Sequence, residues 1–109
     1  MNKKLYINTC TESKTVSYIL DDRKIALAEI SKLPDDTWYF NRIFVPVEYR
    51  GQGIATDLMK ELIKLADESK ITICCDINPY GDLNFDQLKV FYKKFGFVED
   101  DFFHLKRGN

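Results

Sequence analysis

The segment Arg50-Gly51-Gln52-Gly53 separates an apolar run from residues with helical periodicity, and this arrangement could bind an anion. The first N–H groups of a helix have no partner within the helix, and the helix dipole adds positive potential there. Glycine lacks Cβ, so it allows both close approach of a ligand and the backbone angles of an N–H nest. Each charge-assisted hydrogen bond is worth about 1.5–3 kcal/mol. The alternative is a glycine-rich turn beside a solvated arginine.

Two known phosphate-binding motifs compete for this segment. A Walker A loop requires GxxxxGK followed by Ser or Thr, and no lysine follows Gly53. The dinucleotide fingerprint GxGxxG matches Gly51 and Gly53 but has Thr56 in place of the third glycine, while Asp76 lies near the end of the next predicted strand. The fingerprint stays open as a weaker alternative, because a doubly wound sheet needs several crossovers and only one is predicted here.

The residues before this segment have the pattern of β-strands. Short runs rich in Val, Ile, Tyr and Thr alternate with polar clusters, which predicts antiparallel strands connected by hairpins. The predicted strands are residues 5–10, 15–20, 25–30 and 38–45. The fourth carries large side chains on both faces, so we expect it inside the sheet, and Pro46 ends it.

From Gly53 onwards the period becomes helical. Ile54, Leu58 and Leu62 begin an apolar stripe that predicts an amphipathic helix. Residues 71–77 then alternate as a strand, residues 84–95 form a second helix capped by Asn84, and residues 97–106 form a last β segment interrupted at 99–101. Strand, helix and strand in succession make a parallel crossover of right hand. The predicted fold class is α+β or mixed α/β, in one domain over residues 1–109.

Composition and charge exclude several classes of function. The chain is 45% hydrophobic and 30% charged, which is ordinary for a soluble globular protein. A net charge of -1 provides no basic surface for nucleic acid. No apolar stretch is long enough to cross a membrane or serve as a signal peptide, so we expect a cytoplasmic protein without a membrane partner. Cys10, Cys74 and Cys75 lack metal-binding spacing, so we expect reduced core residues and no metal.

Two blocks of the sequence resemble a known family. Residues 43–55, IFVPVEYRGQGIA, resemble motif A of the GNAT superfamily of N-acetyltransferases. Arg50, Gly53 and Ala55 occupy the three defined positions of its signature, which is Gln or Arg, two variable residues, Gly, one variable residue, and Gly or Ala. Residues 88–97, LKVFYKKFGF, resemble the second block of the family, a helix ending in YxxxGF. The two blocks, in this order, are more specific than either alone.

The resemblance implies a GNAT-like fold of the acyl-CoA N-acyltransferase type, with a mostly antiparallel sheet, one splayed parallel strand pair and two main helices. It implies acetyl-CoA as cofactor and transfer of acetyl to a primary amine of a small molecule or a protein. The fourth strand is expected to pair with the pantetheine arm, and the loop amides with the diphosphate. The implied cofactor-binding residues are Ile43, Phe44, Val45, Val47, Arg50, Gly51, Gln52, Gly53, Ile54 and Ala55. The alternative is a CoA-binding or partner-binding module on the same fold that does not turn over.

The same resemblance implies a catalytic role for Tyr92, as the general acid that protonates the departing thiolate. Tyr92 also shares an apolar stripe with Leu88 and Phe95, so a packing role stays as the alternative. A backbone N–H at Ile43 or a neighbour, freed by a bulge in the fourth strand, is expected to polarise the thioester carbonyl. The general base stays open among three carboxylates and a water, the carboxylates being Glu29, Asp36 and Asp76.

The chain departs from the family on its acceptor side. Relatives usually insert two helices between the first and second strands, whereas only residues 11–14 are available here. We therefore expect these helices to be reduced or absent. This reduced side, together with Phe102 and Phe103, favours a homodimer. The sequence leaves the amine acceptor unknown.

Overall fold

The computed structural model describes residues 1–76, 85–101 and 104–108, and these residues form a seven-stranded sheet. Its first four strands are antiparallel neighbours joined by short turns, as the alternating sequence predicts. They are β1 (Lys3–Thr9), β2 (Ser13–Leu20), β3 (Lys24–Lys32) and β4 (Trp38–Phe44). β4 lies between β3 and β5, which confirms that it is an interior strand.

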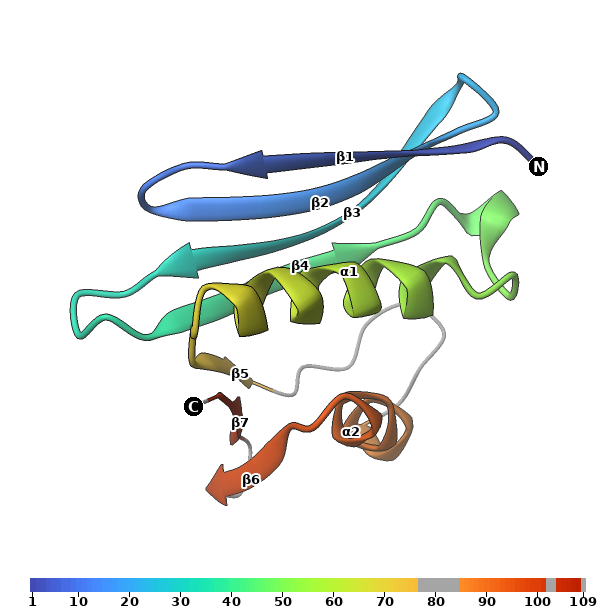
Figure 1. Cartoon of the computed structure of the whole chain (residues 1–109). Helices are drawn as coiled ribbons and strands as arrows, with labels where there is room; N and C mark the ends of the chain where they lie inside the picture. Colours follow the sequence, from blue (N-terminus) through green and yellow to red (C-terminus); the bar gives the residue numbers. More distant parts are fainter. Residues whose placement is uncertain (77–84, 102–103, 109) are drawn as a thin grey trace.

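The second half of the chain supplies both helices and the rest of the sheet (Figure 1). β4 leads through the short helix η1 (Val47–Tyr49) into α1 (Ile54–Glu68) and then into β5 (Ile73–Asp76), which is parallel to β4. α2 (Phe85–Lys94) follows. The predicted last β segment is two antiparallel strands, β6 (Val98–Asp101) and β7 (His104–Arg107), with β7 inserted between β5 and β6.

Both helices cover the same face of the sheet, as Figure 1 shows. Small residues on β3, Ala26 and Ala28, are fully buried and leave room for α1, which packs on β2 and β3. The apolar stripe of α1 buries Leu58 and Leu62 completely. One hydrophobic core therefore lies between the sheet and the two helices, and it sets the position of everything that follows β4.

The opposite face of the sheet has no helical cover among the described residues. β2 begins at Ser13, four residues after β1 ends, so the sequence prediction that the two inserted helices are absent is confirmed. Ile25 and Phe44 on this face are 53% and 46% exposed. We call this surface the open face.

The cysteines do not all lie in the core, which corrects the sequence prediction. Cys75 is buried and Cys74 is half-buried, but Cys10 is exposed in the β1–β2 turn. The prediction fails for Cys10 because it treated a residue at the end of an apolar run as part of a buried strand, whereas β1 is an edge strand exposed along most of its length. All three thiols are free. No helix in the described part of the chain is long and apolar enough to span a membrane.

A bidentate ion pair joins the end of α1 to the last strand. The guanidinium of Arg107 donates to Asp67 Oδ1 and Oδ2 at 2.6 and 3.0 Å, and its Nε donates to the carbonyl of Phe95 at 2.6 Å. Hydrogen bonding to Arg107 lowers the pKa of Asp67 below its ordinary value of 3.8. Because the folded pKa is the lower one, this contribution to stability is present above the unfolded pKa and is lost as pH falls through the folded pKa.

We predict that Asp67→Asn lowers the free energy of unfolding at pH 7 by about 1 kcal/mol or less, since the carboxylate is half-exposed and screened by solvent. The difference from the parent should shrink as the pH falls through the folded pKa of Asp67. Urea unfolding at a series of pH values measures it. The neighbouring Glu68→Gln is the control, because Glu68 has no ion pair within the described residues. A gap between Asp67→Asn and the parent that does not narrow as the pH falls would contradict this account.

Candidate functional site

β4 and β5 form a V that is closed at one end and open at the other. They pair only at Trp38 with Ile73 and at Tyr39 with Cys74, and the Trp38 N–H donates to the Thr72 carbonyl at 2.8 Å. β4 then continues to Phe44 without a further β5 partner among the described residues, whereas β5 stays paired with β7 along its whole length. The β5 side of β4 beyond Tyr39 is thus a strand edge to which an extended ligand could pair.

A β-bulge lies at the opening of this V. Ile30 pairs with Phe40 and Glu29 pairs with Arg42, so Asn41 is an extra residue in β4. The bulge changes the alternation of side chains, and this is why Phe40 and Ile43 both point into the core although they are three residues apart. The predicted bulge in the fourth strand is confirmed.

The loop after β4 has the backbone geometry of an anion site. Gly51 and Gly53 both have φ of +81°, in the left-handed region, and α1 begins at Ile54. The first hydrogen bond of α1 joins the Asp57 N–H to the Gly53 carbonyl at 3.0 Å, and the amides of residues 51–56 have no backbone acceptor within the described chain. A Cβ built on either glycine would meet no atom within 4 Å. The loop therefore presents several N–H donors beside open space.

Tyr49 anchors this loop, and the sequence analysis did not single it out. Its ring is buried, and its hydroxyl donates to Asp21 Oδ2 at 3.0 Å in the β2–β3 turn. Desolvation raises the pKa of Tyr49, while a backbone hydrogen bond from Asn2 and the bond from Tyr49 lower the pKa of Asp21. The only sequence signal was an aromatic residue next to Arg50. The contact spans 28 residues, so no local pattern could identify its partner.

Two charged residues beside the loop are also held. The Nε of Arg50 donates to the Val45 carbonyl at 3.0 Å, which fixes the arginine at the rim of the loop. Glu48, which would repel an anion, forms an ion pair with Lys24 at 2.7 Å. Hydrogen bonding to Lys24 lowers the pKa of Glu48. The negative charge of Glu48 is therefore compensated within the protein.

Tyr92, the predicted general acid, lies within the core. Its ring is 3% exposed and packs edge to face on Phe40 of β4, with 5.6 Å between centroids. Phe91 and Phe97 complete the aromatic cluster around it. Phe40 directly precedes the bulged residue, so Tyr92 is placed beside the opening of the V.

The three candidate bases separate in the structure. Asp36 lies in the β3–β4 turn, at the closed end of the V, where it forms an ion pair with Lys32 at 2.8 Å. Glu29 and Asp76 lie on the open face instead. Tyr39 of β4 pairs with Ser31 of β3 and with Cys74 of β5. Glu29 and Asp76 are each two residues further along these neighbouring strands, towards the opening of the V. Asp36 is thus removed from the V, because it precedes the paired residues rather than following them.

Both remaining carboxylates have fixed partners. Glu29 accepts hydrogen bonds from Thr15 Oγ1 at 3.4 Å and from Asn41 Nδ2 at 3.3 Å, which orients it towards the bulged residue. Asp76 accepts a hydrogen bond from the hydroxyl of Tyr39 at 3.1 Å. Burial raises the pKa of Tyr39, and this hydrogen bond makes the second-largest contribution in the same direction. Two acidic groups therefore flank the opening of the V on the open face.

Some predictions fall on residues that the structure does not describe. Asn84 as the helix cap, and the aromatic pair Phe102 and Phe103, lie outside the described ranges. Of the predicted cofactor-binding residues on β4 and after it, Ile43 and Val45 have buried side chains, whereas Phe44 and Val47 are 46% and 71% exposed. The first two can therefore offer a ligand mainly their backbone.

Comparisons with known proteins agree with this geometry. A family model described as an acetyltransferase (GNAT) domain matches residues 12–99. A GNAT family acetyltransferase from Elizabethkingia anophelis, solved with acetyl-CoA bound, is 15% identical with a TM-score of 0.74, over 99% of each chain. The ribosomal-protein-S18-alanine N-acetyltransferase of Escherichia coli is 15% identical with a TM-score of 0.73, over 92% of this chain and 71% of that one.

A third similar structure is the PaiA N-acetyltransferase of Thermoplasma acidophilum in complex with coenzyme A. It is 19% identical with a TM-score of 0.67, over 90% of this chain and 62% of that one. No curated protein sequence matches the chain significantly. The solved structures, at these identities, bear on the fold. The dinucleotide-binding alternative has no support in this topology, since the only parallel strand pair among the described strands is β4 with β5.

Proposed function

The chain belongs to the GNAT family of acetyltransferases, and on this premise we propose that it transfers the acetyl group of acetyl-CoA to a primary amine of a small molecule or a protein. One observation carries the proposal. Two left-handed glycines leave the amides at the start of α1 without a backbone acceptor, and this loop follows the length of β4 that has no β5 partner. A diphosphate at the loop and an extended arm along the strand need these two features in this order.

The residues present fit this cofactor. The space at Gly51 and Gly53, which a Cβ would occupy, is free for a diphosphate, and Arg50 adds a forked cation at its rim. We assign the amides of residues 51–55 to the diphosphate and the backbone of residues 43–47 to the pantetheine arm, since the Arg50 amide already donates to the Val47 carbonyl. Acetyl-CoA supplies an activated acetyl group as a thioester. The three similar structures include two that contain acetyl-CoA or CoA, which supports this choice.

The protein must move two protons during transfer. The amine nitrogen bonds to the carbonyl carbon and loses a proton, the carbon–sulfur bond breaks, and the sulfur gains a proton. We propose that Glu29 removes the proton from the amine, because Thr15 and Asn41 hold its carboxylate beside the bulged strand. We propose that the Tyr92 hydroxyl donates a proton to the departing sulfur. A backbone N–H at the bulge, at Ile43 or a neighbour, would polarise the carbonyl.

Thiol release tests the proposal directly. The chain is incubated with acetyl-CoA and an amine, and free CoA is detected with 5,5'-dithiobis reagent. The panel should contain an aliphatic diamine, an aminoglycoside, a lysine side chain and a peptide N-terminus. Exposed Cys10 would itself react with the reagent, so the assay uses a Cys10→Ser background. Turnover with at least one amine is expected, and no release with any class would contradict the proposal.

A CoA-binding module without turnover is the second candidate, and the absence of helices over the described part of the open face favours it. Thermal shift with CoA separates the two candidates from a plain scaffold. A ligand at 100 times its dissociation constant should stabilise the fold by about 2.7 kcal/mol. A shift without thiol release would support the module, and the absence of any shift would contradict both candidates.

Glu29→Gln is expected to lower kcat by about tenfold. The effect is smaller than the 10²–10⁴ typical of general base catalysis, because water can still carry the proton from the amine. Binding of acetyl-CoA, measured by calorimetry, should not change. Asp36→Asn is the matched control, since this carboxylate lies at the closed end of the V and should leave kcat unaltered. Equal effects of the two substitutions would remove the basis for choosing Glu29.

We place the reaction in the cytoplasm, where acetyl-CoA is available. The three free cysteines of the chain support a reducing compartment. The location of a tagged chain in fractionated cells tests this proposal, and enrichment outside the cytoplasm would contradict it.

A further inference from the structure

β1 is an exposed edge strand whose charged residues are confined to its first two positions, Lys3 and Lys4, both ion-paired within the chain. Its register with β2 is continuous from Lys3 to Thr9, with neither bulge nor proline. Leu5, Tyr6 and Ile7, at its centre, are 40%, 52% and 49% exposed. Figure 1 shows β1 along the upper border of the sheet, away from both helices. A long, regular edge with an apolar centre of this kind is a template for another strand.

The hydrogen bonds at the two ends of β1 show which backbone groups are available. The Asp21 N–H donates to the Asn2 carbonyl, and the Cys10 N–H donates to the Ser13 carbonyl, each at 2.8 Å. In an antiparallel ladder the residues that bond to one neighbour alternate with those that face away. Even-numbered residues of β1 therefore bond to β2. The N–H and C=O groups of the odd-numbered residues point outward, and these residues are Lys3, Leu5, Ile7 and Thr9.

We propose that β1 pairs antiparallel with β1 of a second copy of this chain, about a twofold axis through Tyr6. This axis is the centre of the seven-residue strand, so the whole strand is paired. It places Leu5 opposite Ile7 of the second copy, and Lys3 opposite Thr9, so that odd-numbered residues face odd-numbered residues and every outward group finds a partner. The same surface serves both copies, as a closed dimer requires.

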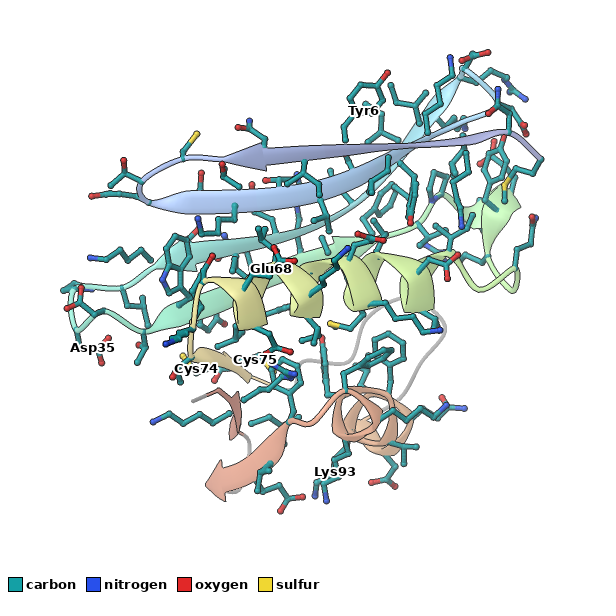
Figure 2. All side chains as sticks on the ribbon, viewed as in Figure 1. Tyr6, Asp35, Glu68, Cys74, Cys75 and Lys93 are labelled. Atoms are coloured by element: carbon teal, nitrogen blue, oxygen red, sulfur yellow. The ribbon has the colours of Figure 1, made fainter. Side chains whose placement is uncertain are left out.

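Side chains and charges fit this register. Leu5 and Ile7 bury each other across the axis on the helix-covered face, while the two Tyr6 side chains meet on the open face. Figure 2 shows Tyr6 projecting away from α1. No lysine faces a lysine, since Lys4 lies opposite Asn8 of the second copy. Lys3 and Lys4 are also paired within their own chain, with Asp57 and Asp22 respectively. An axis through Leu5 or Ile7 would instead leave one end of each strand unpaired.

β6 forms the other edge of the sheet, and its features discourage pairing with β1 of another copy. β6 has four residues and an irregularity between Glu99 and Asp101. The Glu99 carboxylate forms ion pairs with Lys89 at 2.5 Å and Lys93 at 3.2 Å. A bulge and paired charges both discourage strand addition. Contact between β1 and β6 would also give open-ended polymers rather than dimers.

The proposal is independent of the acetyltransferase reaction. β2 and β3 separate β1 from β4, so a dimer through β1 leaves the V and the loop at residues 50–54 accessible in both copies. It joins the two open faces into one continuous surface with the two Tyr6 side chains at its centre.

Molar mass in solution tests the dimer. Sedimentation equilibrium from about 1 to 500 µM covers the micromolar affinity expected for a small interface. The mass should rise from 12.8 kDa to twice that value and no further. Tyr6→Lys should keep the chain monomeric, because it places two like charges opposite each other. Ile25→Lys is the matched control, since Ile25 lies on the same face with 53% exposure but away from the axis. It should still dimerise.

Disulfide formation tests the register, in a Cys10→Ser background. Tyr6→Cys lies on the axis, in a pair that is not hydrogen-bonded, where opposed Cα atoms are closest. It should give a cross-linked dimer at least tenfold faster than Leu5→Cys, whose partner is Ile7. A monomer at every concentration overturns the proposal, as does a dimer that survives Tyr6→Lys or links faster through Leu5→Cys. A monomeric chain that instead binds an extended KKLYINT peptide also overturns it.

Discussion

Replacing Gly53 by valine is expected to abolish measurable binding of acetyl-CoA. Gly53 has φ of +81°, which costs an L-residue about 1–2 kcal/mol, and a β-branched side chain tolerates it least. The new side chain would also occupy the open space beside the first amides of α1. Losing two charge-assisted hydrogen bonds at about 1.5–3 kcal/mol each corresponds to a weakening of at least 100-fold. Titration calorimetry measures this directly.

Gly96→Val is the control for backbone strain. Gly96 has φ of +91°, and a Cβ there would lie 3.2 Å from Nε of Arg107, so valine imposes at least as much strain as at Gly53. It should lower the melting temperature yet leave the heat of acetyl-CoA binding unchanged in the folded protein. If Gly53→Val bound acetyl-CoA like the parent, the amides at the start of α1 could not be the diphosphate site.

The sequence was sufficient for features that depend on neighbours along the chain. The period change at Gly53, the glycine spacing and the missing insertion before Ser13 all lie within short segments, and each predicted the corresponding structure. A bulge in the fourth strand was also expected from the family resemblance, and the structure places it at Asn41. These features define the framework of the site.

The sequence was insufficient for features that depend on distant contacts. The anchor of Tyr49 on Asp21 and the ion pair of Arg107 with Asp67 join residues 28 and 40 positions apart, and no periodicity reports them. Asp36 was one of three candidate bases, but the direction of β4 puts it at the closed end of the V. Choosing among Glu29, Asp36 and Asp76 therefore required the pairing of β4 with β5.

Figure 1 also explains why the acceptor cannot be identified from the pattern of the chain. In our proposal the cofactor binds to β4, α1 and the loop between them, and each of these carries a local sequence signal. The acceptor side that we propose is the open face, where the described surface is a sheet of mixed polar and apolar residues. Glu29 and Asp76 lie near the V on this face, and Arg42, the register partner of Glu29, places a cation beside them.

Tyr92→Phe is expected to lower kcat by about 100-fold with little change in the KM for acetyl-CoA. The ring keeps its contacts with Phe40 and Phe97, so the substitution removes only the hydroxyl, and general acid catalysis is typically worth 10²–10⁴-fold. An interaction made only in the transition state lowers kcat and kcat/KM together, which steady-state kinetics resolves. Losing a buried hydroxyl should change stability by only about 1 kcal/mol.

Tyr18→Phe is the matched control for Tyr92→Phe, because Tyr18 is also buried, at 7% exposure, but lies on β2 beneath Lys3 and away from the V. It should alter stability by a similar amount and leave kcat within twofold. If Tyr92→Phe behaved in the same way, packing in the apolar stripe that Tyr92 shares with Leu88 would be the whole role of this residue. The thiolate would then take its proton from water, and the aromatic cluster around Phe40 would serve only to hold β4 against α2.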